Sequence, residues 1–148
     1  SHIVERLSDP AFRKRSLGSL YLDQRFLAGN GNYLRSEILH VARVHPAEKP
    51  ATIDSRRLRE LARLTLVISR RSYRSRGITV TPEIDKQLKE KDVPFERRRF
   101  YVFGRAGKRC HTCKSKIELT TVASRRLYLC PDCQPVRLNR PRKAGTAA

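Results

Sequence analysis

Apolar residues recur at helical spacing in three stretches of the first half of the chain. The spacing predicts helices over about 16–28, 32–42 and 55–71. Asp54 or Ser55 is the expected N-cap of the third helix. The buried stripe of that helix is predicted to consist of Leu58, Leu61, Ala62, Thr65 and Ile68. The first half of the chain is therefore predicted to be a helical domain.

A turn-forming stretch separates the first two predicted helices. Residues 28–32 contain two glycines and two asparagines, which accept positive φ and so predict a sharp reversal. Backbone N–H groups that point out of the start of the second helix form a natural phosphate site. Asn32 can add an amide donor to that site or can act only as a helix N-cap, and the sequence leaves both interpretations open.

The hydrophobic pattern changes after the third helix. Residues 72–98 hold one glycine, two prolines and a run of charges, which predicts a long loop that is mobile without its ligand. Residues 99–103 predict a strand, and residues 120–122 and 127–129 predict a hairpin with Arg125 at its tip. The second half is thus predicted to be irregular with a little β-structure.

Four cysteines form two C-x-x-C pairs in this second half, with 16 residues between the pairs: Cys110 and Cys113, then Cys130 and Cys133. Each pair makes a tight knuckle, so four thiolates at this spacing can surround one structural Zn²⁺. Two disulfides in a secreted domain are the alternative, but such scaffolds are usually shorter and much richer in cysteine. A redox C-x-x-C motif is also disfavoured, because that chemistry does not need two matched pairs.

These patterns predict a fold that is mainly α with a small β zinc ribbon. The expected order is a helical domain followed by a four-cysteine zinc-finger β-hairpin. The predicted divisions are a helical domain over 1–93 with the mobile loop at about 72–98, a zinc finger over 94–136 and a disordered basic tail over 137–148.

Charge narrows the choice of partner. The chain has 33 Lys and Arg against 14 Asp and Glu, a net charge of +19 over 148 residues. A surface this basic repels itself unless a polyanion is near, so nucleic acid is the first candidate partner and an anionic membrane the second. We expect no membrane association, because no apolar run approaches the ~18 residues of a spanning helix and no signal peptide is visible.

Two stretches of the sequence together resemble one known arrangement. They are LDQRFLAGNGNYLRSEIL at residues 22–39 and TTVASRRLYLCPDCQ at residues 120–134. The combination resembles the C-terminal half of the formamidopyrimidine-DNA glycosylase and endonuclease VIII family, and the endonuclease VIII branch fits best. That half consists of a helix–two-turn–helix motif and a zinc finger.

The resemblance implies roles for residues at the turn and the hairpin. In the family, the Asn that matches Asn32 binds a DNA phosphate beside the turn glycine that matches Gly31. The Arg that matches Arg125 reaches backbone phosphates from the minor-groove side. An ordinary solvated arginine is the alternative for Arg125 and the preferred interpretation of its neighbour Arg126.

The resemblance also implies roles for three residues outside these contacts. Glu37 matches a family glutamate that faces the catalytic half, and a plain helix-surface carboxylate is the alternative. Tyr73 and Arg76 lie at the start of the loop that approaches the extruded base in the family. The sequence does not show which of them touches that base.

The implied activity is removal of an oxidised base from duplex DNA, followed by strand cutting through β,δ-elimination. The family nucleophile is an N-terminal proline amine, assisted by a glutamate and a lysine. This chain starts at Ser1-His2 and lacks methionine, so we expect no catalytic residue in it and a missing N-terminal catalytic domain in the same polypeptide. We expect a monomer in the bacterial cytoplasm, associated with the nucleoid. The alternative is a non-enzymatic zinc-ribbon protein that binds nucleic acid in the ribosome or in transcription.

Overall fold

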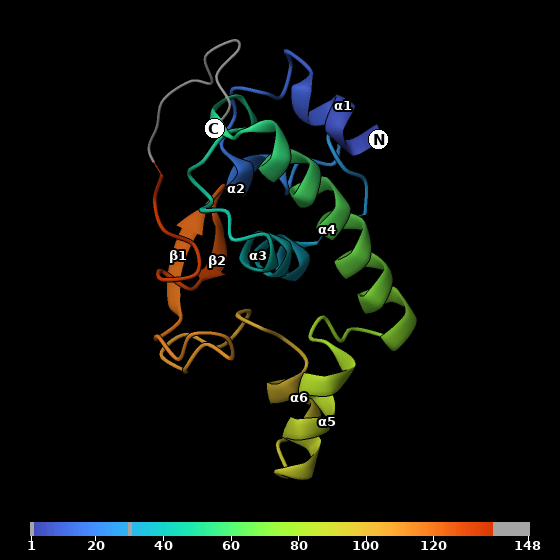
Figure 1. Ribbon diagram of the computed structural model, residues 1–148, viewed down its shortest axis with the longest axis vertical. Coiled ribbons are helices and arrows are strands. Elements are labelled where there is room, and N and C mark those ends of the chain that lie inside the picture. Colours follow the sequence, from blue (N-terminus) through green and yellow to red (C-terminus); the bar gives the residue numbers. More distant parts are fainter. Residues whose placement is uncertain (1, 30, 138–148) are drawn as a thin grey trace.

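The computed structural model describes residues 2–29 and 31–137, which form helices and one small antiparallel sheet at their side (Figure 1). Predictions for Asn30 and for residues 138–148 of the basic tail lie outside the described residues. The elements are α1 (His2–Ser8), α2 (Leu17–Leu20), α3 (Asn32–Val41), the 3₁₀ helix η1 (Pro50–Thr52), α4 (Ser55–Ser75), α5 (Pro82–Glu90), α6 (Phe95–Arg98), β1 (Glu118–Val122) and β2 (Arg125–Leu129).

Two of the predicted helices are confirmed as α3 and α4. The Asp54 side chain caps α4 by accepting a hydrogen bond from the backbone N–H of Arg57 at 2.9 Å. The helix runs beyond the predicted end and stops where Arg76 adopts a left-handed conformation at φ 59°. Helix α1 was not predicted.

The helix predicted over 16–28 is wrong beyond its first turn, because only α2 forms there. Asp23 accepts a hydrogen bond from the backbone N–H of Arg25 at 2.9 Å. This side-chain bond offers the backbone an alternative to helix, and the chain turns instead. Apolar spacing alone missed this competition.

The prediction of a loop over 72–98 is also wrong, because α4 extends into this stretch and α5 and α6 follow. The prolines that were expected to break structure stand at helix starts, where a missing N–H costs nothing. Pro82 begins α5 behind the N-cap Thr81, and Pro94 is the N-cap residue of α6. Helices α5 and α6 pack on each other and project from one end of the molecule (Figure 1).

The hairpin is confirmed, and the strand expected over 99–103 is not. Strands β1 and β2 pair antiparallel, with Val122 opposite Arg125. Ala123 and Ser124 both have positive φ, which suits the twist of a tight hairpin turn. Arg125 is thus the first residue of β2 and not part of the turn.

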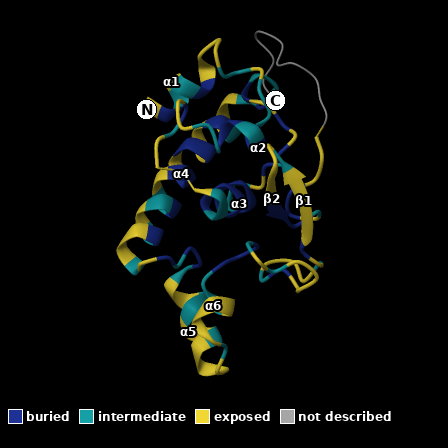
Figure 2. Cartoon of the chain, turned by 180° about the vertical axis from the view of Figure 1, so that it is seen from behind, coloured by how far each residue is buried: buried dark blue, intermediate teal, exposed yellow. Residues whose placement is uncertain are grey.

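Helix α3 lies at the centre of the molecule. It packs against α4 on one side and β2 on the other, and both views show α3 between these two elements (Figures 1 and 2). Leu127 and Leu129 of β2 belong to the same hydrophobic cluster as the helices. A second cluster surrounds the cysteines and includes Tyr101, Val102 and Tyr128. The hairpin therefore shares its core with the helices, while the division near residue 93 stays a prediction.

Candidate nucleic-acid interface and metal centre

The start of α3 presents the first part of the candidate interface. Gly31 is the N-cap residue and makes no side-chain cap, so Asn32 is the first helical residue. The interpretation of Asn32 as the N-cap is therefore wrong. Its Nδ2 donates to the backbone oxygen of Arg126 at 2.9 Å. An amide nitrogen carries two hydrogens, so one N–H remains for an external acceptor.

Arg35 connects the start of α3 to the hairpin. Its Nη2 donates to Oδ1 of Asn32 at 2.8 Å and to the backbone oxygens of Arg125 and Arg126 at 3.3 Å each. Its Nη1 donates to the backbone oxygen of Val122 at 2.9 Å. One guanidinium therefore fixes Asn32 and the first residues of β2 relative to each other. No role for Arg35 was predicted, although it lies one helical turn from Asn32 on the same face.

This guanidinium is fully buried, and within residues 2–29 and 31–137 it forms no ion pair with a carboxylate. Burial and the nearby positive charge of Arg125 lower the pKa of Arg35 to about 10. A buried cation without a counter-charge is costly. An anion that approached Asn32 and Arg125 would therefore gain from the positive potential there.

Arg125 and Arg126 are both exposed at the start of β2. Successive residues of a strand point to opposite faces, so the two side chains leave the hairpin in different directions. The Arg35 bonds bring the side chain of Asn32 close to the backbone of Arg125, and a phosphate contact by these two residues stays a prediction.

Glu37 lies on the opposite side of α3 from solvent. It is fully buried, and its carboxylate accepts backbone N–H groups of Tyr101 at 2.6 Å, Val102 at 2.8 Å and Phe103 at 3.0 Å. The hydroxyl of Thr79 donates to it as well. The interpretation as a helix-surface carboxylate is wrong, and a role toward a catalytic half stays a prediction. These bonds also explain why residues 101–103 do not pair as a strand.

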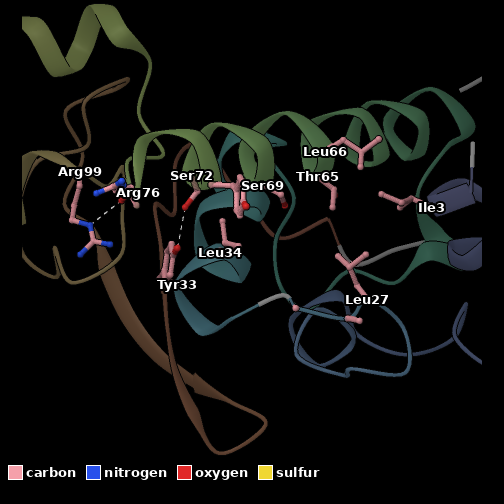
Figure 3. A pocket seen from close by; sticks show the side chains of 14 residues that line it. Ile3, Leu27, Tyr33, Leu34, Thr65, Leu66, Ser69, Ser72, Arg76 and Arg99 are labelled. Carbon is pink, nitrogen blue, oxygen red and sulfur yellow. Dashed lines mark hydrogen bonds between the residues drawn. The ribbon is translucent and has the colours of Figure 1, made fainter.

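Tyr73 and Arg76 border a pocket of about 560 Å³ between the turn before α3 and helix α4 (Figure 3). Tyr73 is 88% exposed, and Arg76 is exposed at the C-terminal end of α4. The floor is largely apolar, and the Tyr33 hydroxyl is 2.9 Å from the Ser72 hydroxyl, as the dashed line in Figure 3 marks. None of the described residues of β1 or β2 lines this pocket, so Tyr73 and Arg76 form a group separate from Asn32 and Arg125.

The four cysteines converge as the spacing predicted, from the two knuckles. Their sulfur atoms all lie within 4.8 Å of one another, and Cys110, Cys130 and Cys133 are buried. Sγ of Cys110 is 3.8 Å from that of Cys133, and Sγ of Cys113 is 3.3 Å from that of Cys130. These separations are far longer than a disulfide bond, so four thiol groups face one point.

The ionisation of these thiols shows what a cation would contribute. Burial raises the pKa of Cys110, but bonds from His40 and from backbone N–H groups outweigh it and lower that pKa to about 5. Burial and the neighbouring sulfurs raise the pKa of Cys130 and of Cys133. One thiolate thus opposes ionisation of the others. A divalent cation removes this opposition, and four sulfurs in a tetrahedral set suit Zn²⁺.

Two residues beyond the cysteines hold this cluster against α3. The imidazole of His40 hydrogen-bonds to Cys110, and its Nδ1 lies 3.3 Å from Oε1 of Gln134. That same oxygen accepts the backbone N–H of Cys130 at 2.9 Å, and Nε2 of Gln134 donates to the backbone oxygen of Val44 at 3.0 Å. Sequence reasoning missed both residues. The only signal was the position of Gln134 directly after the last cysteine.

A turn between two helices and a four-cysteine hairpin locked to the second helix define a helix–two-turn–helix, four-cysteine-finger protein. The chain is homologous to Endonuclease 8: it is 41% identical to that of Pectobacterium atrosepticum, 43% to that of Escherichia coli K12 and 44% to that of Klebsiella pneumoniae, over 132 residues each. The chain is therefore similar, over most of its own length, to part of Endonuclease 8. The alignments cover 89% of this chain but 47% of each relative, so the chain spans about half the length of the curated relatives it matches.

Solved structures show the same fold. Fpg of Lactococcus lactis in complex with DNA that contains an abasic site superposes with a TM-score of 0.69 at 22% identity, over 91% of this chain and 46% of that one. The G226P mutant of the same protein, in complex with Fapy-dG DNA, gives a TM-score of 0.71 at 23% identity, over 91% and 47%. No family model matches the chain. Among the described residues, no helix has the length and apolar character needed to cross a membrane.

Proposed function

We propose that this chain is the DNA-binding part of a glycosylase and abasic-site lyase that acts on oxidised bases in duplex DNA. The homology to Endonuclease 8 includes both the helices and the cysteine hairpin, which a zinc-ribbon protein of another class does not account for. The partner is double-stranded DNA that carries an oxidised base or an abasic site. Its place in the cell is the bacterial nucleoid, where the lesions occur.

The observation that carries this proposal is the bond set of Arg35. It joins Asn32 and the backbone of Arg125, the two residues that the family resemblance assigns to phosphate binding. Asn32 contributes its remaining N–H together with the backbone N–H groups at the start of α3. Arg125 contributes an exposed fork of donors from the hairpin. The buried charge of Arg35 adds a positive potential to the same place.

Tyr73, Arg76 and the pocket they border complete the proposal. The pocket lies beside the end of α4, and its apolar walls and exposed aromatic ring suit an extruded base. Gly31 leaves open space beside the phosphate site, because no atom lies within 4 Å of the position that a Cβ would take there.

Cys110, Cys113, Cys130 and Cys133 would hold one structural Zn²⁺. When bound, the ion would link the two knuckles and would take no part in the chemistry of the lesion. Strand cutting belongs to the proline, glutamate and lysine of the family's N-terminal half. This chain alone is therefore expected to bind DNA without cutting it.

Duplex binding measured over a range of salt concentrations tests the phosphate site. Arg125→Ala should weaken binding to a 14-base-pair duplex with an abasic-site analogue. It should also lower the slope of log K against log salt by about one unit. Arg126→Ala is the matched control, because it removes the same charge from the neighbouring exposed position of β2.

Equal losses in the Arg125 and Arg126 variants would reject a specific phosphate contact at Arg125. Strand cutting of the abasic duplex by the 148-residue chain alone would reject the assignment of chemistry to the other half. A longer polypeptide with the native N-terminal residues provides the positive control for that assay.

A further inference from the structure

Helix α4 carries seven arginines and one glutamate over Ser55–Ser75. Two of the arginines are bound to the rest of the protein. Arg57 forms an ion pair with Glu48 at 2.9 Å, and Arg71 donates to the backbone oxygen of Thr79 at 2.8 Å. The other five are exposed: Arg56, Arg59, Arg63, Arg70 and Arg74. The outer face of α4 therefore has five positive charges that are not bound to the rest of the protein in the way that Arg57 and Arg71 are.

These five exposed arginines lie along one side of α4 and are called the arginine stripe here. At 100° per residue they fall within a sector of about 60°. The sector is opposite the buried face of α4, whose residues include Leu58, Leu61, Thr65 and Ile68. Figure 2 shows exposed positions along this outer side of the helix. The stripe is straight and about 27 Å long, because each helical residue rises about 1.5 Å.

The stripe has little internal neutralisation. Only Arg63 has an ion-pair partner among the described residues, and that partner is Glu60 on the same helix, at 2.5 Å. The side chains of the other four, Arg56, Arg59, Arg70 and Arg74, form no hydrogen bond or ion pair within residues 2–29 and 31–137. The planar fork of an exposed arginine can bind a phosphate group through two parallel hydrogen bonds, as it can a carboxylate.

The arrangement favours duplex DNA over a lipid surface. A helix that binds membranes presents its apolar face to the lipid, whereas the apolar face of α4 is buried in the protein core. A row of cations about 27 Å long instead matches the phosphates of roughly eight base pairs, at about 3.4 Å per phosphate along a strand.

The stripe is distinct from the phosphate site at Asn32 and Arg125. Helix α3 lies between α4 and the hairpin (Figure 1). The stripe is on the side of α4 opposite its buried residues and therefore faces away from α3. One short duplex cannot lie on both surfaces. We propose that the arginine stripe of α4 is a second, sequence-independent binding surface for the backbone of duplex DNA, which holds another segment while the first site is occupied. The binding surface itself is inferred from α4 alone, whereas the simultaneous occupation of a first site rests on the proposed function.

The test compares two variants that lose the same charge. The stripe variant changes Arg56, Arg59, Arg70 and Arg74 to Gln. The control variant changes Lys86, Lys89, Lys91 and Arg97 to Gln, which are exposed residues on or beside α5 and α6. Circular dichroism and thermal melting establish that both variants fold. If the stripe variant does not fold, the pairs Arg56/Arg59 and Arg70/Arg74 are changed separately.

The probe is an undamaged 12-base-pair duplex, which is too short to reach both surfaces. At low salt we expect two duplexes per protein by sedimentation for the unchanged chain and for the control variant, and one for the stripe variant. The binding event that the stripe variant loses should have a slope of log K against log salt that corresponds to about three to four neutralised phosphates. Arg125→Ala should remove binding of the duplex at the site of Asn32 and Arg125 and leave binding at the stripe. The experiment therefore distinguishes a wrong proposal for the stripe from a wrong proposal for the hairpin site.

Indistinguishable stoichiometry and salt slopes in the stripe and control variants would overturn the inference. A membrane role would overturn it as well. That outcome would appear as selective loss of binding to phosphatidylserine vesicles by the stripe variant, with both duplex-binding events intact.

Discussion

The carboxylate of Glu37 accepts the backbone N–H of Val102 at 2.8 Å, across 65 positions of sequence. The same carboxylate accepts the N–H groups of Tyr101 and Phe103 and the hydroxyl of Thr79. A buried carboxylate that satisfies four donors fixes the segment that enters the first cysteine knuckle. Helix α3 therefore sets the position of the four-cysteine cluster as well as that of Asn32.

Replacing Glu37 by Gln should destabilise the protein by about 2–4 kcal/mol. The amide keeps the size of the side chain. Its NH₂ group, however, would replace one carboxylate oxygen and would face backbone N–H donors that bond to that oxygen in the unchanged protein. Urea unfolding followed by circular dichroism gives the free energy, and the exposed Glu118→Gln serves as the matched control. A Glu37 variant as stable as the Glu118 variant would contradict the structural role.

The elements that follow from local pattern were predictable from the sequence. Helices α3 and α4 have clear apolar periodicity and α4 has a polar N-cap, and the cysteine spacing determined the four-sulfur cluster. Helix starts at Pro82 and Pro94 were misjudged because proline both ends and begins helices. When the residues around a proline are charged, their hydrophobic pattern does not show whether the proline begins a helix or ends one.

The features that depend on distant contacts were not predictable. Residues 101–103 have strand composition, but their N–H groups bond to Glu37 instead of to a neighbouring strand. Arg35 is buried against the propensity of its type, and only the folded hairpin provides its acceptors. The family resemblance named Asn32 and Arg125 but not the residue that joins them.

Arg35→Lys should loosen the joint between α3 and the hairpin. An ammonium group has three donors at one point, so it cannot reach Val122, Asn32 and Arg125 together as the planar fork does. We expect faster amide hydrogen exchange in β2 and at least fivefold weaker binding of an abasic duplex. Arg43→Lys, at an exposed position just after α3, is the control. Unchanged exchange in β2 would show that the hairpin is held by its apolar residues alone.

Asp23 links acid stability to the turn before α3. Hydrogen bonds from Arg25, the largest effect, and from Arg15, the next largest, lower the pKa of Asp23 well below its ordinary value of 3.8. A lowered carboxyl pKa stabilises the folded state above the unfolded pKa, and this contribution is lost as the pH falls through the folded value. Asp23→Asn should therefore be less stable than the unchanged protein at pH 7, and the difference should shrink below about pH 4.

Urea unfolding at pH 7, 4 and 2.5 measures this difference, with Asp92→Asn as the control because Asp92 is exposed and no ion pair is found for it among the described residues. A difference that stays constant down to pH 2.5 would mean that Asp23 acts through its shape and not its charge.

His40 should slow the release of zinc from the cysteine cluster. Its imidazole joins Cys110 to Gln134, and it packs against Tyr101 with ring centroids 5.5 Å apart. Phe at this position keeps the ring contact and removes both hydrogen bonds. Because groups that orient metal ligands typically change metal affinity by about 10–100-fold, we expect zinc to leave the His40→Phe variant at least tenfold faster. Transfer to a chromogenic chelator measures the rate.

His45→Phe is the matched control for this experiment, since His45 lies just beyond α3 and its Nδ1 accepts the backbone N–H of Ala47.

Gln134→Leu should reproduce the effect of His40→Phe, because it removes the oxygen that bonds both His40 and the backbone of Cys130. The double variant should then release zinc little faster than either single variant, as expected for residues that act through one hydrogen-bond network. Release rates in the His40 variant equal to those in the His45 variant would mean that the four cysteines alone determine how tightly the metal is held.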